Sequence, residues 1–123
     1  MPERVAIVGS KRSVAPERML RVREILYALP SDTIVVTGCD REGVAQWVRF
    51  MCRDRGLVVI VVNAPWRIRG TQAGHLRNEG IVQISDRVIA FPSQPTEPPA
   101  SVGTWDVVQR ARLRKLPHEV VHV

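Results

Sequence analysis

The chain has 123 residues, 45% of them hydrophobic and 24% charged, which is the balance of a globular protein and enough for one domain with a proper core. Lys and Arg number 18 against 12 Asp and Glu, and the net charge of +6 favours anionic partners such as nucleotides, nucleic acid or acidic proteins. No apolar run approaches the ~20 residues of a membrane span, and the N-terminus has no signal-peptide pattern, so we expect a cytoplasmic protein without a membrane partner. In such a chain Cys39 and Cys52 are not expected to form a disulfide.

Five apolar, β-branched runs predict five strands: VAIVG (5–9), TIVVTG (33–38), LVVIVVNA (57–64), RVIAFP (87–92) and HEVVHV (118–123). The runs are continuous rather than alternating, as expected for strands that are buried on both faces of a parallel sheet. Segments with helical periodicity separate them. This alternation predicts a single α/β domain over residues 1–123, in which a doubly wound, Rossmann-like parallel sheet of five strands, in the order 3-2-1-4-5, carries helices on both faces.

Four helices are predicted from the spacing of apolar residues. The first begins near Pro16, the second ends at Gly56, the third lies within AGHLRNEGIV (73–82), and the fourth runs from about 104 to 115. The apolar residues expected on the buried faces of the first three are Met19, Val22, Leu26 and Leu29; Val44, Trp47, Val48 and Met51; and Leu76, Gly80, Ile81 and Ile84. The third helix is unusual, because it contains two glycines, each costing about 1 kcal/mol relative to Ala in a helix interior, and places Arg77, Asn78 and Glu79 side by side.

Six of the eight glycines follow a predicted strand or begin the next helix: Gly9, Gly38, Gly43, Gly70, Gly74 and Gly103. The carboxyl ends of parallel strands share one edge of the sheet, which is where ligands bind in doubly wound folds. Glycines there let backbone N–H groups approach an anion, and helix N-termini add partial positive charge. With the order 3-2-1-4-5, the loops after strands one and four flank the point where the strand order reverses. We therefore expect a ligand site in the crevice between them.

Two standard phosphate-binding patterns, GxGxxG and GxxxxGK[ST], are absent. Four other motifs occur in the order and spacing of a known family: VAIVGSKRS, VVTGCDREGVA, AGHLRNEGIV and VGTWDVV. They resemble the SLOG superfamily, which includes the cytokinin-activating LOG enzymes and the DNA-binding DprA proteins, and are most similar to its small YspA-like branch. The resemblance covers nearly the whole chain. It implies a Rossmann-like fold that binds a nucleotide or nucleotide-derived phosphorylated ligand, as a sensor or binding domain.

The sequence departs from the family patterns in three places. Lys11 stands where the YspA-like branch has arginine, and Cys39 replaces the second glycine of a pair. The position of the catalytic glutamate of the LOG enzymes falls on Val107, with Asp106 one residue short of it. Asp106 is therefore only a tentative catalytic residue, for a LOG-like phosphoribohydrolase that would cleave the N-glycosidic bond of nucleoside 5′-monophosphates.

The remaining motif residues have roles in ligand binding that agree with the resemblance. Gly103 and Thr104 open the fourth helix and can donate N–H groups and a hydroxyl to a phosphate, with Gly9, Ser10 and Lys11 facing them across the crevice. The fork of Arg77 suits a phosphate or a ribose, and Asn78 suits a ribose hydroxyl. The other residues assigned to the ligand are Gly38, Asp40, Arg41 and Gly74.

Several residues keep a second interpretation. Asp40 fits a ribose hydroxyl and an ordinary helix N-cap equally well, and Trp105 suits either stacking on a base or packing in the core. Glu79 is expected to pair locally or to lie exposed. The three histidines have no metal-ligand spacing with cysteine, so neither a metal nor a cofactor is expected.

Partners follow from the same patterns. A nucleotide-like small molecule is the main expectation, and a homodimer is implied by analogy with LOG enzymes. DprA-like binding of single-stranded DNA is the second alternative. It is less favoured, because aromatics are only 5% of the chain and the densest basic cluster, RARLRK (110–115), contains none.

Overall fold

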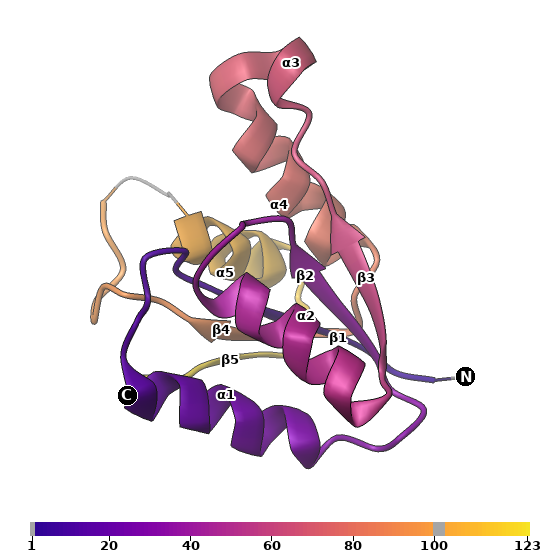
Figure 1. The fold of residues 1–123 in the computed structure, drawn as a ribbon. Helices are drawn as coiled ribbons and strands as arrows, with labels where there is room; N and C mark the ends of the chain where they lie inside the picture. Colours follow the sequence, from indigo (N-terminus) through magenta and orange to yellow (C-terminus); the bar gives the residue numbers. More distant parts are fainter. Residues whose placement is uncertain (1, 100–102) are drawn as a thin grey trace.

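A parallel five-stranded sheet forms the centre of the protein in the computed structural model, which describes residues 2–99 and 103–123 (Figure 1). The strands are β1 (Arg4–Gly9), β2 (Ile34–Gly38), β3 (Val58–Val62), β4 (Arg87–Phe91) and β5 (His118–Val120). Their order is β3-β2-β1-β4-β5, and every neighbouring pair is parallel. The predicted fold class and strand order are therefore confirmed.

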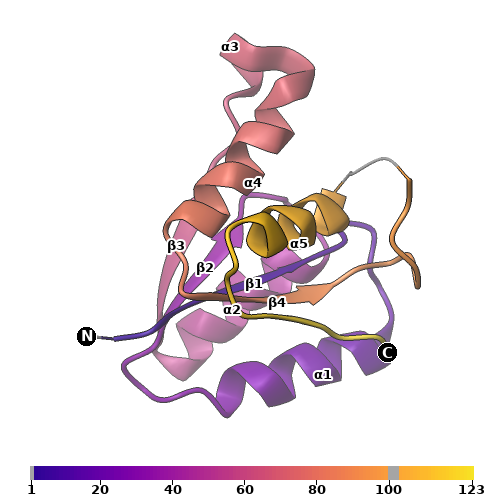
Figure 2. The same ribbon diagram turned by 180° about the vertical axis from the view of Figure 1, so that it is seen from behind.

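Helices cover both faces of the sheet (Figures 1 and 2). Helices α1 (Pro16–Tyr27) and α2 (Val44–Arg55) pack together on one face, and α4 (Ala73–Gln83) and α5 (Gly103–Leu113) pack together on the other. The chain leaves β1 toward one face and β4 toward the other, because the connections run outward in opposite directions from these two central strands. The point where the strand order reverses thus lies between β1 and β4, and in doubly wound folds ligands bind outside the carboxyl ends of the strands at this point.

The two faces of the sheet bury different kinds of side chain. On β1, Val5 and Ile7 belong to the core under α1 and α2, whereas Ala6 and Val8 belong to the core under α4 and α5. Small residues on the second face bring the helices close to the strands. A Cβ on Gly80 of α4 would lie only 3.3 Å from Cγ1 of Val62 on β3, so this helical glycine permits close helix–sheet packing.

Some expected burial patterns were wrong. In α1 the core begins at Val22, and Met19, one turn earlier, is exposed. In α4 Leu76 is exposed, while Asn78 takes a buried position because its amide is hydrogen-bonded there. Strand β3 lies at the edge of the sheet, so Val58 is exposed rather than covered on both faces.

The connection between β3 and α4 contains two short elements that the periodicity did not indicate. These are α3 (Trp66–Arg69) and the 3₁₀ helix η1 (Gly70–Gln72). Together with the start of α4 they form an arm that stands away from the sheet on its carboxyl-end side (Figure 1). The arm was missed because four residues are too few for a helical period to show.

Candidate functional site

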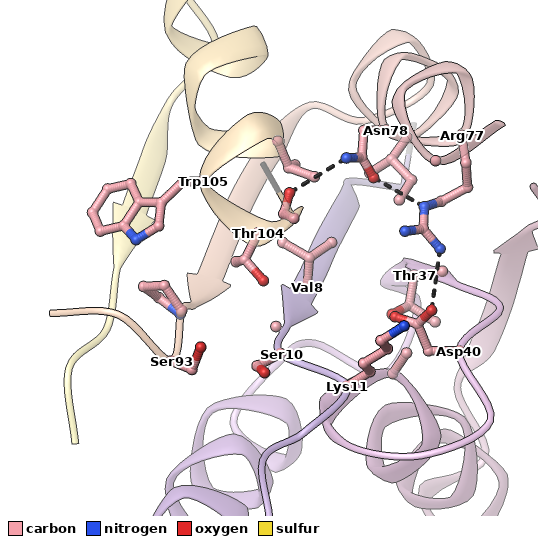
Figure 3. Close-up of a pocket in the computed structure, with 18 of the residues that line it drawn as sticks. Val8, Ser10, Lys11, Thr37, Asp40, Arg77, Asn78, Ser93, Thr104 and Trp105 are labelled. Atoms are coloured by element: carbon pink, nitrogen blue, oxygen red, sulfur yellow. Dashed lines mark hydrogen bonds and ion pairs between the residues drawn. The ribbon is translucent and has the colours of Figure 1, made fainter. Parts of the chain in front are cut away.

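A cavity of about 620 Å³ opens at the carboxyl ends of β1, β2 and β4, where the strand order reverses (Figure 3). Its walls are the loops after these three strands and the N-terminal parts of α4 and α5. This volume lies within the range of ~300–1,000 Å³ that is usual for small-molecule sites. The cavity therefore occupies the place where the sequence predicted a ligand.

The first pair of facing walls comes from the loop after β1 and the start of α5. Ser10 and Lys11 lie on one wall and Gly103 and Thr104 on the other, as expected (Figure 3). Gly103 opens α5 with a φ of 54°, a value that few residues other than glycine adopt. The first N–H groups of a helix have no intrahelical acceptor, so this end of the cavity offers donors and partial positive charge to an anion.

Glycine at position 43 fixes the shape of the β1 loop. Its φ is 77°, and a Cβ there would lie 2.3 Å from the carbonyl oxygen of Ser10 and 2.5 Å from Cα of Lys11. That carbonyl oxygen accepts hydrogen bonds from the N–H groups of Ser13 and Val44. Gly9 is restricted too, since a Cβ would lie 2.5 Å from Cγ2 of Val44. Both glycines thus permit close packing of the loop against α2, and Gly9 also lines the cavity, where its approach to an anion stays a prediction.

The guanidinium of Arg77 lies across the end of β2. Its Nε donates to Oδ1 of Asn78 at 2.9 Å, and its Nη1 lies 3.6 Å from Oδ1 of Asp40 (Figure 3). The side chain of Arg77 is only 13% exposed, so its position is well defined by these partners. A Cβ on Gly38 would lie 2.9 Å from Nη1, which shows that this glycine leaves room for the guanidinium. Arg77, Asp40 and Gly38 are therefore brought together, on the wall opposite α5.

The amide of Asn78 connects this arginine to α5. Its Nδ2 donates to Oδ2 of Asp106 at 2.9 Å and to the carbonyl oxygen of Gly103 at 3.3 Å, while its Oδ1 accepts from Arg77. Asn78 lines the cavity but is buried. In this structure its amide orients Arg77 and the start of α5, and a contact with a ribose stays a prediction.

The carboxylate of Asp106 lies between α4 and α5. It is buried, and its Oδ2 accepts hydrogen bonds from Asn78 and from Nε of Arg110 and lies 3.1 Å from Nδ1 of His75. Asp106 is not among the residues that line the cavity, whereas its neighbour Val107 is. Among the described residues on the cavity wall, Asp40 is the one carboxylate.

Glu79 completes the group of three polar residues on α4. It accepts hydrogen bonds from Nη1 of Arg110 at 2.7 Å and from Nε of Arg114 at 2.9 Å, both on or just after α5. These hydrogen bonds, that of Arg114 first, hold the pKa of Glu79 below its ordinary value. The expectation of a local or exposed Glu79 was wrong. Arg77 thus faces the cavity, Asn78 links Arg77 to α5 by hydrogen bonds, and Glu79 connects α4 to the α5 segment through ion pairs.

The other predicted residues are placed as follows. Gly74 lines the cavity, but a Cβ there would make only ordinary contact with the ring of Trp66. Arg41 is exposed and does not line the cavity. Asp40 does not cap α2, whose N-cap is Gly43 without a side-chain hydrogen bond. Trp105 is buried in the core under α4 and α5 and its Nε1 donates to the carbonyl oxygen of Gln94, but the residue also lines the cavity, so stacking on a base stays a prediction.

Several contributors to the site were not assigned to it from the sequence, among them Arg49, Ser93, Gln94 and Trp66. Arg49, on α2, donates to the carbonyl oxygens of Gly38 and Asp40 and so holds the loop after β2. Ser93 and Gln94 line the cavity from the long 93–103 connection, of which residues 100–102 lie outside the described part. Trp66, on the arm, lines it as well. The length of the connection was a usable signal for the loop. Nothing in the sequence marked Arg49.

The two cysteines have different surroundings, with Sγ of Cys39 lying 3.9 Å from Nη1 of Arg77. Cys39 and Cys52 carry free thiols, and burial raises the pKa of the Cys52 thiol to about 11, so that thiol stays protonated. Among residues 2–99 and 103–123, no three His, Cys, Asp or Glu side chains gather closely enough to hold a metal ion. None of the described helices combines the length and apolarity that crossing a bilayer requires.

Sheet order, two helical layers and a cavity at the reversal point define a Rossmann-like α/β fold. No protein-family model matches the sequence, and no curated protein matches it either. Among solved structures, DNA processing protein A (DprA) from Streptococcus pneumoniae is similar, with a TM-score of 0.78 and 15% sequence identity over 97% of this chain. The matched region is 50% of that DprA chain, so the present chain spans about half its length. At this identity the similarity shows the fold, which is the one implied by the SLOG resemblance.

Proposed function

We propose that the protein binds a nucleotide or a nucleotide-derived phosphorylated ligand in this cavity, as a sensor or binding domain of the YspA-like kind. One observation carries the proposal: Lys11 and the N-terminus of α5 lie on facing walls of a single cavity where the strand order reverses. The charge of the wall supports it. Its described residues include three cations, Lys11, Arg12 and Arg77, against one carboxylate, Asp40.

The free energy of binding expected from these groups is enough to hold a ligand without any chemical reaction. A helix N-terminus contributes about 0.5–1 kcal/mol to binding an anion, and charge-assisted hydrogen bonds from Lys11 and Arg77 contribute ~1.5–3 kcal/mol each. These contributions add to roughly 4–7 kcal/mol, which corresponds to dissociation constants between millimolar and micromolar. The ion pair with Asp40 keeps Arg77 in place before a ligand arrives.

The proposal is tested by thermal unfolding with a panel of nucleoside monophosphates, dinucleotides and ADP-ribose. At least one ligand is expected to raise the melting temperature of the wild type, and the Arg77→Ala variant is expected to lose the shift. Arg87→Ala is the matched control, because Arg87 is also a partly buried arginine in an ion pair, with Glu3, but lies at the first residue of β4, away from the cavity. No shift with any ligand, or an equal loss in both variants, would contradict the proposal.

Hydrolysis of the nucleotide is less supported by this geometry. The reaction needs a carboxylate near the ribose to stabilise an oxocarbenium-like centre. Asp106 is held between α4 and α5 by hydrogen bonds. The residue that lines the cavity at the position of the catalytic glutamate of LOG enzymes is the apolar Val107. Incubating the pure protein with AMP and assaying free adenine tests this alternative directly.

Binding of single-stranded nucleic acid is the second candidate, and one feature of the arm favours it. On α3, Trp66 and Ile68 alternate with Arg67 and Arg69, and all four are exposed. An exposed aromatic residue beside cations, here Trp66 with Arg67 and Arg69, is a feature of single-strand binding surfaces. The similarity to DprA, a DNA processing protein by its name, agrees with this candidate. It predicts that a fluorescent oligothymidine binds at ~50 mM salt and more weakly at ~200 mM, and that Arg67→Ala with Arg69→Ala removes the binding.

A further inference from the structure

The arm places one tryptophan in an unusual position. Trp66 is 56% exposed, whereas Trp47 and Trp105 are 8% and 7% exposed and lie in the two cores. Trp66 and Trp105 both line the cavity, and Trp66 is the one whose surface is mostly exposed. A large aromatic side chain that is left half in solvent at the rim of a cavity marks a place where a ligand or partner supplies the missing contact.

The ring of Trp66 lies beside the first turn of α4. Its Cη2 lies 3.6 Å from the position that a Cβ on Gly74 would occupy, which is ordinary van der Waals contact. Gly74 therefore presents no side chain to the edge of the ring, and Trp66 keeps more than half of its surface exposed. A rigid aromatic surface of this kind costs little conformational entropy when a flat ligand stacks on it.

The polar groups of the cavity lie on other elements. Lys11 comes from the loop after β1 and Thr104 from the start of α5, whereas Trp66 comes from the arm after β3. One cavity thus combines an anion-binding region with an aromatic side chain. A nucleotide has the matching pair of groups, a phosphate and a flat heteroaromatic base.

We infer that Trp66 is the residue that recognises the base of the ligand, by stacking its indole ring on the base, and that the ligand class is therefore nucleotides rather than sugar phosphates. The inference rests on the proposed function, in which Lys11 and the start of α5 hold the phosphate. Because every base has a π-face, stacking tolerates all bases, and the larger purine rings are expected to bind more tightly than pyrimidines.

The experiment compares the affinities of AMP and ribose 5-phosphate, measured by calorimetry, for the wild type and three variants. Trp66→Leu keeps an apolar side chain but removes the ring, and Trp66→Phe restores a smaller ring. Ile68→Ala is the matched control, because Ile68 is an exposed apolar residue of the same four-residue helix that does not line the cavity.

Trp66→Leu is expected to weaken AMP binding by a factor of about 5 to 150 and to leave ribose 5-phosphate binding nearly unchanged. Trp66→Phe should recover part of the affinity, and Ile68→Ala should behave as the wild type. AMP should quench tryptophan fluorescence more strongly in the wild type than in Trp66→Leu, which keeps Trp105 at the cavity, a difference that a merely structural role would not produce.

The outcomes separate the inference from the proposal beneath it. If the wild type binds AMP and Trp66→Leu binds it equally well, the inference fails and the proposed function stands. If the wild type binds no nucleotide, both fail. If Ile68→Ala loses as much AMP affinity as Trp66→Leu, the inference is overturned. It is also overturned if Trp66→Leu changes the association state of the protein in sedimentation without changing its affinity for AMP, because the arm would then contact a protein partner. If oligothymidine binds tightly through Trp66 and AMP does not bind at all, the inference is overturned, and the ligand of Trp66 is single-stranded nucleic acid.

Discussion

The side-chain amide of Asn78 donates from Nδ2 to Oδ2 of Asp106 at 2.9 Å, and both residues are 4% exposed between α4 and α5. The same amide accepts from Nε of Arg77 through Oδ1. A buried carboxylate on one helix therefore fixes the orientation of an amide on the next, and the amide fixes the cation at the cavity. This relationship makes the position of Arg77 a property of the packing of α4 on α5.

Replacement of Asn78 with alanine is expected to lower the free energy of unfolding by about 1–3 kcal/mol, because Asp106 loses a buried donor and Arg77 an acceptor. Urea unfolding followed by circular dichroism measures this. Gln83→Ala is the control, since Gln83 is an exposed amide residue on the same helix, and it should change stability by less than ~0.5 kcal/mol. Equal small effects of both substitutions would show that the amide does not join the two helices.

Two glycines with nearly the same φ but very different ψ, −152° at Gly43 and 23° at Gly56, give a second prediction. Gly43 has a φ of 77° and Gly56 a φ of 80°, but a Cβ on Gly43 would meet the backbone of Ser10 and Lys11, whereas a Cβ on Gly56 would meet no atom within 4 Å. Gly56→Ala should therefore cost about 1–2 kcal/mol for the left-handed conformation alone. Gly43→Ala should cost clearly more, because the φ and ψ of Gly43 lie in a region that is essentially restricted to glycine and because backbone atoms of Ser10 and Lys11 must shift as well. Similar melting temperatures for the two variants would mean that the backbone of the loop after β1 can shift at little cost in free energy.

The strand order was predictable because its determinants are local. Each strand is a continuous apolar run, and strand–helix alternation with right-handed crossovers leaves few topologies for five strands. The edge of the sheet that carries the cavity follows from the same reasoning. Exposure of Val58 was missed, since an apolar run looks the same at the edge of a sheet as at its centre.

Roles within the site were less predictable, because they depend on contacts between residues far apart in the chain. The partners of Glu79, Arg110 and Arg114, lie 31 and 35 residues away on or after α5. Whether Asp106 or Val107 faces the cavity depends on the rotation of α5 about its axis, which the sequence does not specify to within one residue. Motifs placed these residues at the correct edge of the sheet, and packing decided which way each one points.

A third prediction separates the placement of Arg77 from its charge. In Gly38→Ala, the new Cβ would lie 2.9 Å from Nη1 of Arg77, so the flexible guanidinium is expected to move while the backbone stays in place. Ligand binding should then weaken toward that of Arg77→Ala, and the melting temperature without ligand should fall by only a few degrees. The nucleotide thermal-shift titration measures both quantities. Undiminished binding in Gly38→Ala would show that the observed position of Arg77 is not the one that the ligand requires.

The fourth prediction concerns acid stability. Hydrogen bonds from Arg114 and Arg110 hold the pKa of Glu79 below the ordinary value of 4.5, so the folded state binds its proton less readily than the unfolded chain. The resulting stability is present above about pH 4.5 and is lost as the pH falls through the lower pKa of the folded state. Glu79→Gln should therefore be less stable than the wild type at pH 7, by about 0.5–1 kcal/mol for a partly exposed ion-pair network, and the difference should shrink below pH 4.5.

Unfolding in urea at a series of pH values from 3 to 7 provides the measurement, and Glu97→Gln is the matched control. Glu97 also pairs with an arginine of α5, Arg112, but this pair is more exposed and has a single arginine. Its substitution should change stability less at every pH. A difference between wild type and Glu79→Gln that stays constant down to pH 3 would show that the carboxylate charge does not contribute, because only a charge-dependent contribution disappears when Glu79 takes up its proton.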